Sequence, residues 1–341
     1  MNANEKYYRK TIGAIGGGML IFLLLLNLFG IAISLIPSLL SLLRVDTVPS
    51  TVIYQLIYAA GYLFSFMMPV LFIKLWIKKA GYPYAPMYAS LKISGYIPLI
   101  LFAGVTLIFA FASINAQLVS IFDYSAFSSD ILWDEGAKSE PYELILQFIT
   151  ICVVPGFCEE FLFRGSILTN CLPFGRSNAI LISALLFGLM HQNAEQILYA
   201  FAAGILLGIV YERTGSIWNC TVLHIFNNFM SLIGGVVIEK WGTGWLGYLG
   251  YTLFETAIFV LGMISLTVLI IRFFSQKKSF RDGFFGKELP ASDDYATHPI
   301  AADRARKLFL TPTMVLFFVF CILQILMLIG LAVLYNGISG I

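Results

Sequence analysis

Several polar residue types that can perform hydrolytic chemistry stand inside strongly apolar stretches of this sequence. They are two adjacent carboxylates, a guanidinium, two imidazoles and a carboxamide: Glu159, Glu160, Arg164, His191, His224 and Asn228. A charged side chain at membrane depth costs about 2.5 kcal/mol or more unless it is paired or hydrated, so such a group indicates a functional site.

The spacing of these residues predicts how they are used. Glu160 and Arg164 stand four residues apart, so on a helix they can form an ion pair. Glu159 projects about 100° away from Glu160 and is the freer carboxylate. His224 and Asn228 share a helix face and supply hydrogen-bond donors suited to an oxyanion. A carboxylate with a histidine can instead deprotonate a water as a general base.

The composition places these residues in a membrane protein. The 341 residues are 59% hydrophobic and only 12% charged, with a mean hydropathy of +0.86. These values predict an all-α polytopic transmembrane bundle rather than soluble domains. The five cysteines show no metal-ligand spacing and lie almost wholly in apolar segments, so we expect reduced, buried thiols. The polar start is followed by an apolar run too long for a cleavable signal, so the first segment should remain as an anchor.

Apolar runs near the length of a membrane span, roughly 20 residues, occur in about eight or nine places. We expect spans near 12–42, 52–77, 93–122, 142–172, 178–191, 195–211, 216–238, 245–274 and 308–336. The fifth and sixth are short, so one of them could be a partial or tilted span. Pro155 should kink the fourth, and Gly16–Gly18 with Pro37 should make the first irregular. Gly204 and Gly208 should permit close helix packing.

The charges of the loops predict the orientation. Basic residues gather in the N-terminus, in the second loop and in the last loop, near 275–307, whereas the loop at 123–140 is acidic. Because basic residues collect on the cytoplasmic side, the N-terminus should be cytoplasmic and the C-terminus, after nine spans, external. Helical rise then puts Glu160, His191 and His224 roughly 12 to 20 Å from the cytoplasmic ends of their helices. One shared polar site is therefore allowed.

These motifs together resemble those of a known family. Glu159-Glu160-x-x-x-Arg164, Phe187-x-x-x-His191 and His224-x-x-x-Asn228, in this order on successive apolar helices, are similar to those of the CPBP family. This family holds CAAX-prenyl-protease and bacteriocin-processing intramembrane proteases, and is also called Abi. The resemblance divides the chain into N-terminal helices at 1–140, a catalytic core of four helices at 141–238 and C-terminal helices at 239–341.

The resemblance implies a role for each residue. Glu159 and His191 would activate the attacking water, with Glu160 and Arg164 supporting them. His224 and Asn228 would stabilise the oxyanion formed at the scissile carbonyl. Two cofactor options stay open: a metal-free glutamate-dependent hydrolase, or a zinc enzyme with Glu159, His191 and His224 as candidate ligands. We favour the metal-free option. The expected substrate is a membrane-associated or lipidated protein or peptide, in the lipid bilayer of a bacterial plasma membrane.

Other functions compete with this hypothesis. The acids and Arg164 could form a structural ion-pair network, and Cys158 could be a nucleophile, although a thiol in apolar surroundings should be inert. Buried Glu and His residues also occur in the proton relays of transporters, but no internal duplication supports a transporter. A non-proteolytic bacteriocin-immunity or scaffold protein is the remaining alternative. No feature indicates nucleic acid binding, and the sequence does not reveal the oligomeric state.

Overall fold

The computed structural model describes residues 1–35, 39, 42, 50–89, 95–120, 141–241, 244–275, 297–298 and 300–339. Within these ranges the chain forms helices and no strand, and an isolated bridge pairs Ala89 with Ser216. The helices are α1 (Ala3–Ser34), α3 (Ser50–Lys79), α4 (Ile97–Ser120), α5 (Pro141–Gln147), α6 (Val154–Glu160), α7 (Thr169–Cys171), α8 (Arg176–Met190), α9 (Ala194–Thr214), α10 (Ile217–Trp241), α11 (Trp245–Ser275), α13 (Ala302–Phe309) and α14 (Pro312–Ser339).

The expected all-α polytopic bundle is confirmed. Seven helices in the described part of the chain are long and apolar enough to cross a membrane: α1, α3, α4, the continuous helix through α5 to α7, α9, α11 and α14. Helix α8 has 15 residues, about 22 Å by helical rise, which is shorter than a hydrocarbon core of about 30 Å. Helix α10, the expected seventh span, is not among these seven helices of the described part of the chain. The protein is therefore an integral membrane protein.

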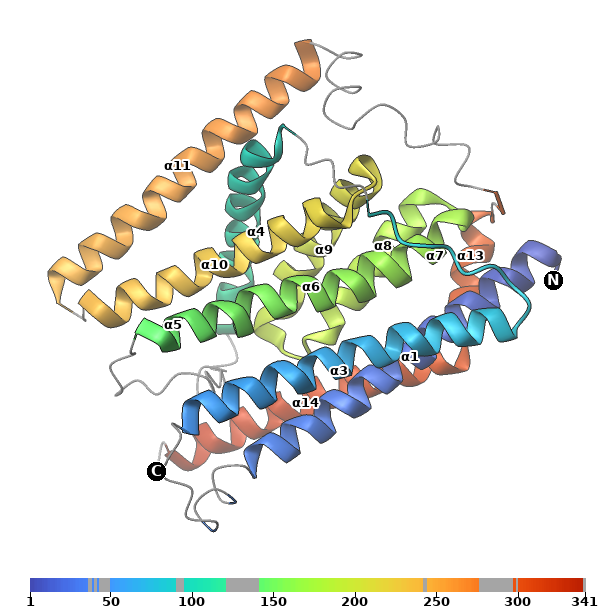
Figure 1. The fold of residues 1–341 in the computed structure, drawn as a ribbon, viewed down its shortest axis with the longest axis horizontal. Coiled ribbons are helices and arrows are strands. Elements are labelled where there is room, and N and C mark those ends of the chain that lie inside the picture. The colour runs from blue at the N-terminus through green and yellow to red at the C-terminus, as the bar shows by residue number, and fades with distance from the viewer. Residues whose placement is uncertain are drawn as a thin grey trace.

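Helix α1 ends earlier than expected and has no break at its three glycines. It runs from Ala3 to Ser34, while Pro37 lies outside the described residues. A Cβ added at Gly16 would lie 2.7 Å from the Met314 backbone nitrogen of α14. The glycine is thus needed for close approach between α1 and α14, and it does not unwind the helix. Helices α1, α3 and α14 form one side of the bundle (Figure 1).

The helix that carries the acidic motif is continuous but not uniform. Two π-helical stretches interrupt it, Phe148–Val153 and Phe161–Leu168, and a 3₁₀ turn, Leu172–Phe174, ends it. The first π-helical stretch ends at Val153, just before Pro155, the position at which a kink was expected. Stretches of this kind are frequent at functional sites because they change which side chains face a neighbour. Helix α6 lies between α3 and α10 (Figure 1).

The prediction of membrane orientation stays a prediction. The acidic loop at 123–140, Lys92 and most of the basic loop at 275–307 lie outside the described residues. Helix α1 begins and α14 ends at opposite ends of their group (Figure 1). The short basic helix α13 binds the start of α1, because Arg304 Nε donates to Glu5 Oε1 at 2.7 Å.

Candidate active site

The acidic motif lies at the junction of α6 and the second π-helical stretch, inside the bundle. Glu160 and Arg164 are fully buried, and Glu159 keeps only 4% of its surface exposed. Three charged side chains are thus removed from solvent within two helical turns. Burial of this kind is tolerated only where each charge finds a partner, so the partners define the site.

Glu160 and Arg164 form the ion pair that their spacing predicts. Arg164 Nη1 lies 3.0 Å from Glu160 Oε1. Its Nη2 donates to the Gly204 carbonyl of α9 at 3.2 Å, and its guanidinium lies 4.5 Å from the centre of the Phe187 ring. A Cβ at Gly204 would stand 2.8 Å from the Cα of Ala184, so this glycine lets α8 and α9 meet as expected. Arg164 therefore joins the acidic helix to both of them.

His224 of α10 lies between the two carboxylates. Its Nδ1 is 2.8 Å from Glu160 Oε1, and its Nε2 is 3.8 Å from Glu159 Oε2. Because a carboxylate only accepts hydrogen bonds, Nδ1 of His224 carries the proton in the contact with Glu160. If Nε2 is protonated as well, the charges of His224 and Arg164 balance those of Glu159 and Glu160. The second gap is too long for a direct hydrogen bond.

Glu159 has a partner that the sequence analysis missed. The Tyr62 hydroxyl of α3 donates to Glu159 Oε1, while Oε2 has no hydrogen-bond partner. The carboxylate is therefore held at one oxygen and available at the other, on the side of His224. A signal for this residue does exist, because Tyr54, Tyr58 and Tyr62 recur every four residues and so occupy one face of an otherwise apolar helix.

His191 follows the last residue of α8. Its Nδ1 donates to the Phe187 carbonyl at 2.9 Å. A carbonyl cannot donate, so Nδ1 holds the proton and Nε2 of the neutral ring carries a lone pair. The Phe187 ring is 5.4 Å from the His191 ring and 5.9 Å from the His224 ring, centre to centre. Phe187 thus brings the second and third motifs to the same region.

Asn228 stands one turn after His224 on α10 and contacts an earlier part of the helix that carries the acidic motif. Its Nδ2 donates to the Ile151 carbonyl at 3.1 Å. Ile151 stands four residues before Pro155, which has no N–H to offer that carbonyl. Asn228 therefore satisfies the backbone just before α6 with one of its two amide hydrogens, and helps to place the helix that carries Glu159.

The candidate zinc ligands do not form a metal site here. Within the described ranges, no three or more His, Cys, Asp or Glu side chains are grouped so that they could hold a metal ion. Zinc needs its ligand atoms about 2 Å from a common point. Glu159 Oε2 and His224 Nε2 could supply two ligands, but His191 does not complete the set.

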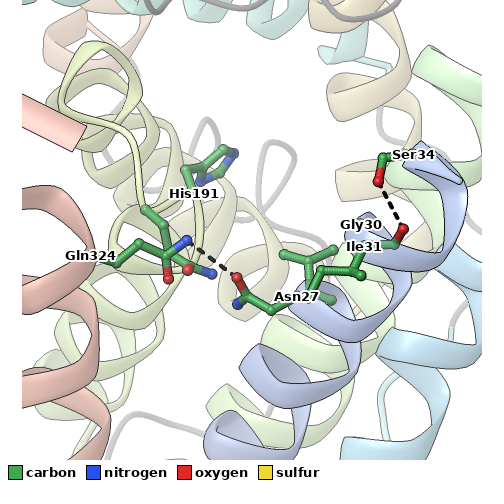
Figure 2. Close-up of a pocket in the computed structure, with 8 residues that line it drawn as sticks. Asn27, Gly30, Ile31, Ser34, His191 and Gln324 are labelled. Carbon is green, nitrogen blue, oxygen red and sulfur yellow. Dashed lines mark hydrogen bonds between the residues drawn. The ribbon is translucent and has the colours of Figure 1, made fainter. Parts of the chain in front are cut away.

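A pocket of about 390 Å³ lies on one side of His191. Its walls come from α1, from the turn between α8 and α9, and from α14. The lining residues are Leu26, Asn27, Gly30, Ile31, Ser34, His191, Gln192 and Gln324, and we call this cavity the amide pocket. Figure 2 shows Asn27 of α1 and Gln324 of α14 reaching toward each other, with His191 beside them.

The fold and the site define a polytopic helical membrane protein with a buried centre of carboxylates, histidines and an arginine. Residues 141–230 match the family model of the Rce1-like type II CAAX prenyl endopeptidases. The resemblance to the CPBP family that the three motifs predict is thereby confirmed for this segment. No curated protein and no solved structure matched the chain. The matched segment contains every one of the motif residues described above.

Proposed function

We propose that this protein is an intramembrane endopeptidase of the CAAX-prenyl-protease type that hydrolyses a peptide bond of a membrane-associated or lipidated protein. One observation carries the proposal. The buried carboxylate of Glu159 has an unpartnered oxygen 3.8 Å from Nε2 of His224. Glu160 Oε2 also lacks a hydrogen bond, but Glu160 Oε1 is held directly by both Arg164 and His224, so Glu159 is the carboxylate of the pair without a direct hydrogen bond to a cation. The match of residues 141–230 supports the same conclusion.

Glu159 Oε2 is the general base in this proposal. A water held between Glu159 Oε2 and the imidazoles attacks the carbonyl carbon of the substrate, and its proton passes to Glu159. The tetrahedral intermediate then collapses as the carbon–nitrogen bond breaks, and Glu159 returns the proton to the leaving amine. His191 contributes through the lone pair of Nε2, which can accept from the same water because Nδ1 is occupied by the Phe187 carbonyl.

Charge on the oxyanion is stabilised by donors from α10. Protonated Nε2 of His224 faces the space beside Glu159, and Glu160 stabilises the imidazolium through Nδ1. Asn228 has a second amide hydrogen beyond the one that the Ile151 carbonyl accepts. Donors fixed before the reaction, in a site without bulk water, stabilise developing charge most effectively. Arg164 keeps Glu160 in place without touching the substrate.

The proposal is tested by incubating the purified full chain, in lipid nanodiscs, with a library of membrane-anchored and lipidated peptides, and by identifying products by mass spectrometry. We expect cleavage by the wild type and none by Glu159→Gln, His191→Ala or His224→Ala at unchanged thermal stability. We also expect activity to persist after treatment with a chelator. Loss on chelation and recovery with zinc would overturn the metal-free mechanism. Transport or immunity activity without cleavage of any peptide would overturn the function.

A further inference from the structure

The amide pocket is built mainly by parts of the chain outside the matched segment. Helices α1 and α14 supply six of its eight lining residues, and both lie beyond residues 141–230. Only His191 and Gln192 come from the matched segment. His191 therefore belongs both to the proposed catalytic centre and to the amide pocket.

Three of the five polar side chains that line the pocket are carboxamides, those of Asn27, Gln192 and Gln324, and the other two are Ser34 and His191. Gln324 Nε2 donates to Asn27 Oδ1 at 3.4 Å, and Gln324 Oε1 has no partner. Gln192 is only 4% exposed, and its Oε1 has no partner either. Buried polar atoms are normally hydrogen-bonded, so two unsatisfied oxygens in one cavity need an explanation. Both oxygens are buried, so donors from a ligand would satisfy them after a rotation of the glutamine side chains toward the cavity.

The backbone at Gln192 gives a second, independent indication. Gln192 has φ 53°, and among the described residues it is the one residue other than glycine with a positive φ. Such a conformation costs of order 1 kcal/mol and clusters at functional sites. At this position it places the Gln192 side chain in the wall of the pocket instead of continuing α8 toward α9.

We propose that the amide pocket binds the main chain of an extended, uncharged peptide segment next to the scissile bond, an inference that rests on the proposed function. After that rotation the two glutamine oxygens accept hydrogen bonds, which the N–H groups of a peptide backbone can donate. A phosphate or carboxylate headgroup offers acceptors instead, and no lysine or arginine lines the cavity. A lipid acyl chain offers no donor. Leu26 and Ile31 leave apolar contacts for the side chains of the peptide.

Glycine positions on α1 provide a blocking variant and a matched control. Gly30 lines the pocket, and a Cβ added there meets no atom within 4 Å. A Cβ at Gly13 on the same helix also meets nothing within 4 Å, yet Gly13 is not part of the pocket. Gly30→Phe should therefore fill the cavity, while Gly13→Phe makes the same chemical change away from it. Both replacements favour the helix.

Binding is measured with the full chain carrying Glu159→Gln, which prevents turnover, and a short fluorescent peptide of uncharged residues as the probe. We expect Gly30→Phe to weaken binding by at least about tenfold and Gly13→Phe to leave it within about twofold. Gln192→Leu and Gln324→Leu should each weaken it about three- to tenfold, the value of one hydrogen bond. A peptide of the same sequence with N-methylated main-chain amides should bind more weakly and be insensitive to Gln192→Leu.

Equal affinity of the Gly30→Phe and Gly13→Phe proteins, or of the two peptides, would overturn the inference. The comparison of the two peptides needs no change in the pocket, so it decides the matter even if a pocket variant fails to fold. Cleavage by the chain with Glu159 intact is measured separately. Binding in the pocket without cleavage would reject the proposed function alone, whereas cleavage with unaltered binding in Gly30→Phe would reject the pocket alone.

Discussion

Replacing Tyr62 by phenylalanine removes the hydroxyl that donates to Glu159 and leaves the aromatic ring in place. The ring of Tyr62 stacks on Phe66 at 4.6 Å between centres and contacts Tyr58 at 5.7 Å. These contacts do not need the hydroxyl, so the packing of α3 should persist. The change therefore isolates one hydrogen bond to the proposed base.

The expected size of the effect follows from the charge of the acceptor. A hydrogen bond to a charged group is worth about 1.5 to 3 kcal/mol. If that energy holds Glu159 Oε2 toward the attacking water, its loss corresponds to a fall of about 10- to 100-fold in kcat. The KM should change little, because Tyr62 is a positioning residue and does not line the amide pocket.

The assay is peptide cleavage by the wild type, Tyr62→Phe, Tyr58→Phe and the double variant Tyr62→Phe with Glu159→Gln. Tyr58→Phe removes a hydroxyl one turn away and should retain most activity. In the Glu159→Gln protein the loss of the Tyr62 hydroxyl should have no further effect, because the two residues act through one carboxylate. Full activity of Tyr62→Phe, or an equal loss in Tyr58→Phe, would refute the positioning role.

Three further variants test the scaffold of the site. Arg164→Met should destabilise the protein by about 3 to 5 kcal/mol because it removes one of the two cationic partners of buried Glu160 and leaves only His224; an unchanged thermal midpoint would contradict this. Asn228→Ala should lower both the thermal midpoint and kcat. Adding Pro155→Ala should restore the midpoint by supplying an N–H to the Ile151 carbonyl, while kcat remains about 100-fold low. Recovery of both the midpoint and kcat would make Asn228 purely structural. Gly204→Leu should prevent folding, since even its Cβ would lie within 2.8 Å of a neighbouring backbone atom; a folded variant, seen by gel filtration, would disprove the close contact.

Local spacing and composition were sufficient to predict much of the fold and one contact of the site. Runs of apolar residues predicted the transmembrane bundle because the bilayer requires long apolar helices. The pairing of Glu160 with Arg164 follows from helical geometry alone. The π-helical stretches could not be predicted, since Pro155 signals a disturbance of the helix without specifying its form.

Contacts between helices that are distant in the sequence could not be predicted from the sequence. His224 and Glu160 are 64 residues apart, and Tyr62 and Glu159 are 97 residues apart. Comparable depth in the membrane allowed the first pair to meet, but nothing in the spacing showed which helix faces would pack. Asn228 illustrates the same limit, because its bond to the Ile151 carbonyl depends on how α10 packs against the acidic helix.

The most direct test of the central claim is a single-turnover cleavage in water enriched in the heavy oxygen isotope, with the wild type and Glu159→Gln compared at equal thermal stability. We predict that the wild type places one heavy oxygen in the new carboxylate of the product and that Glu159→Gln forms no product. Cleavage that continues in Glu159→Gln would contradict the assignment of Glu159 as the base that activates water.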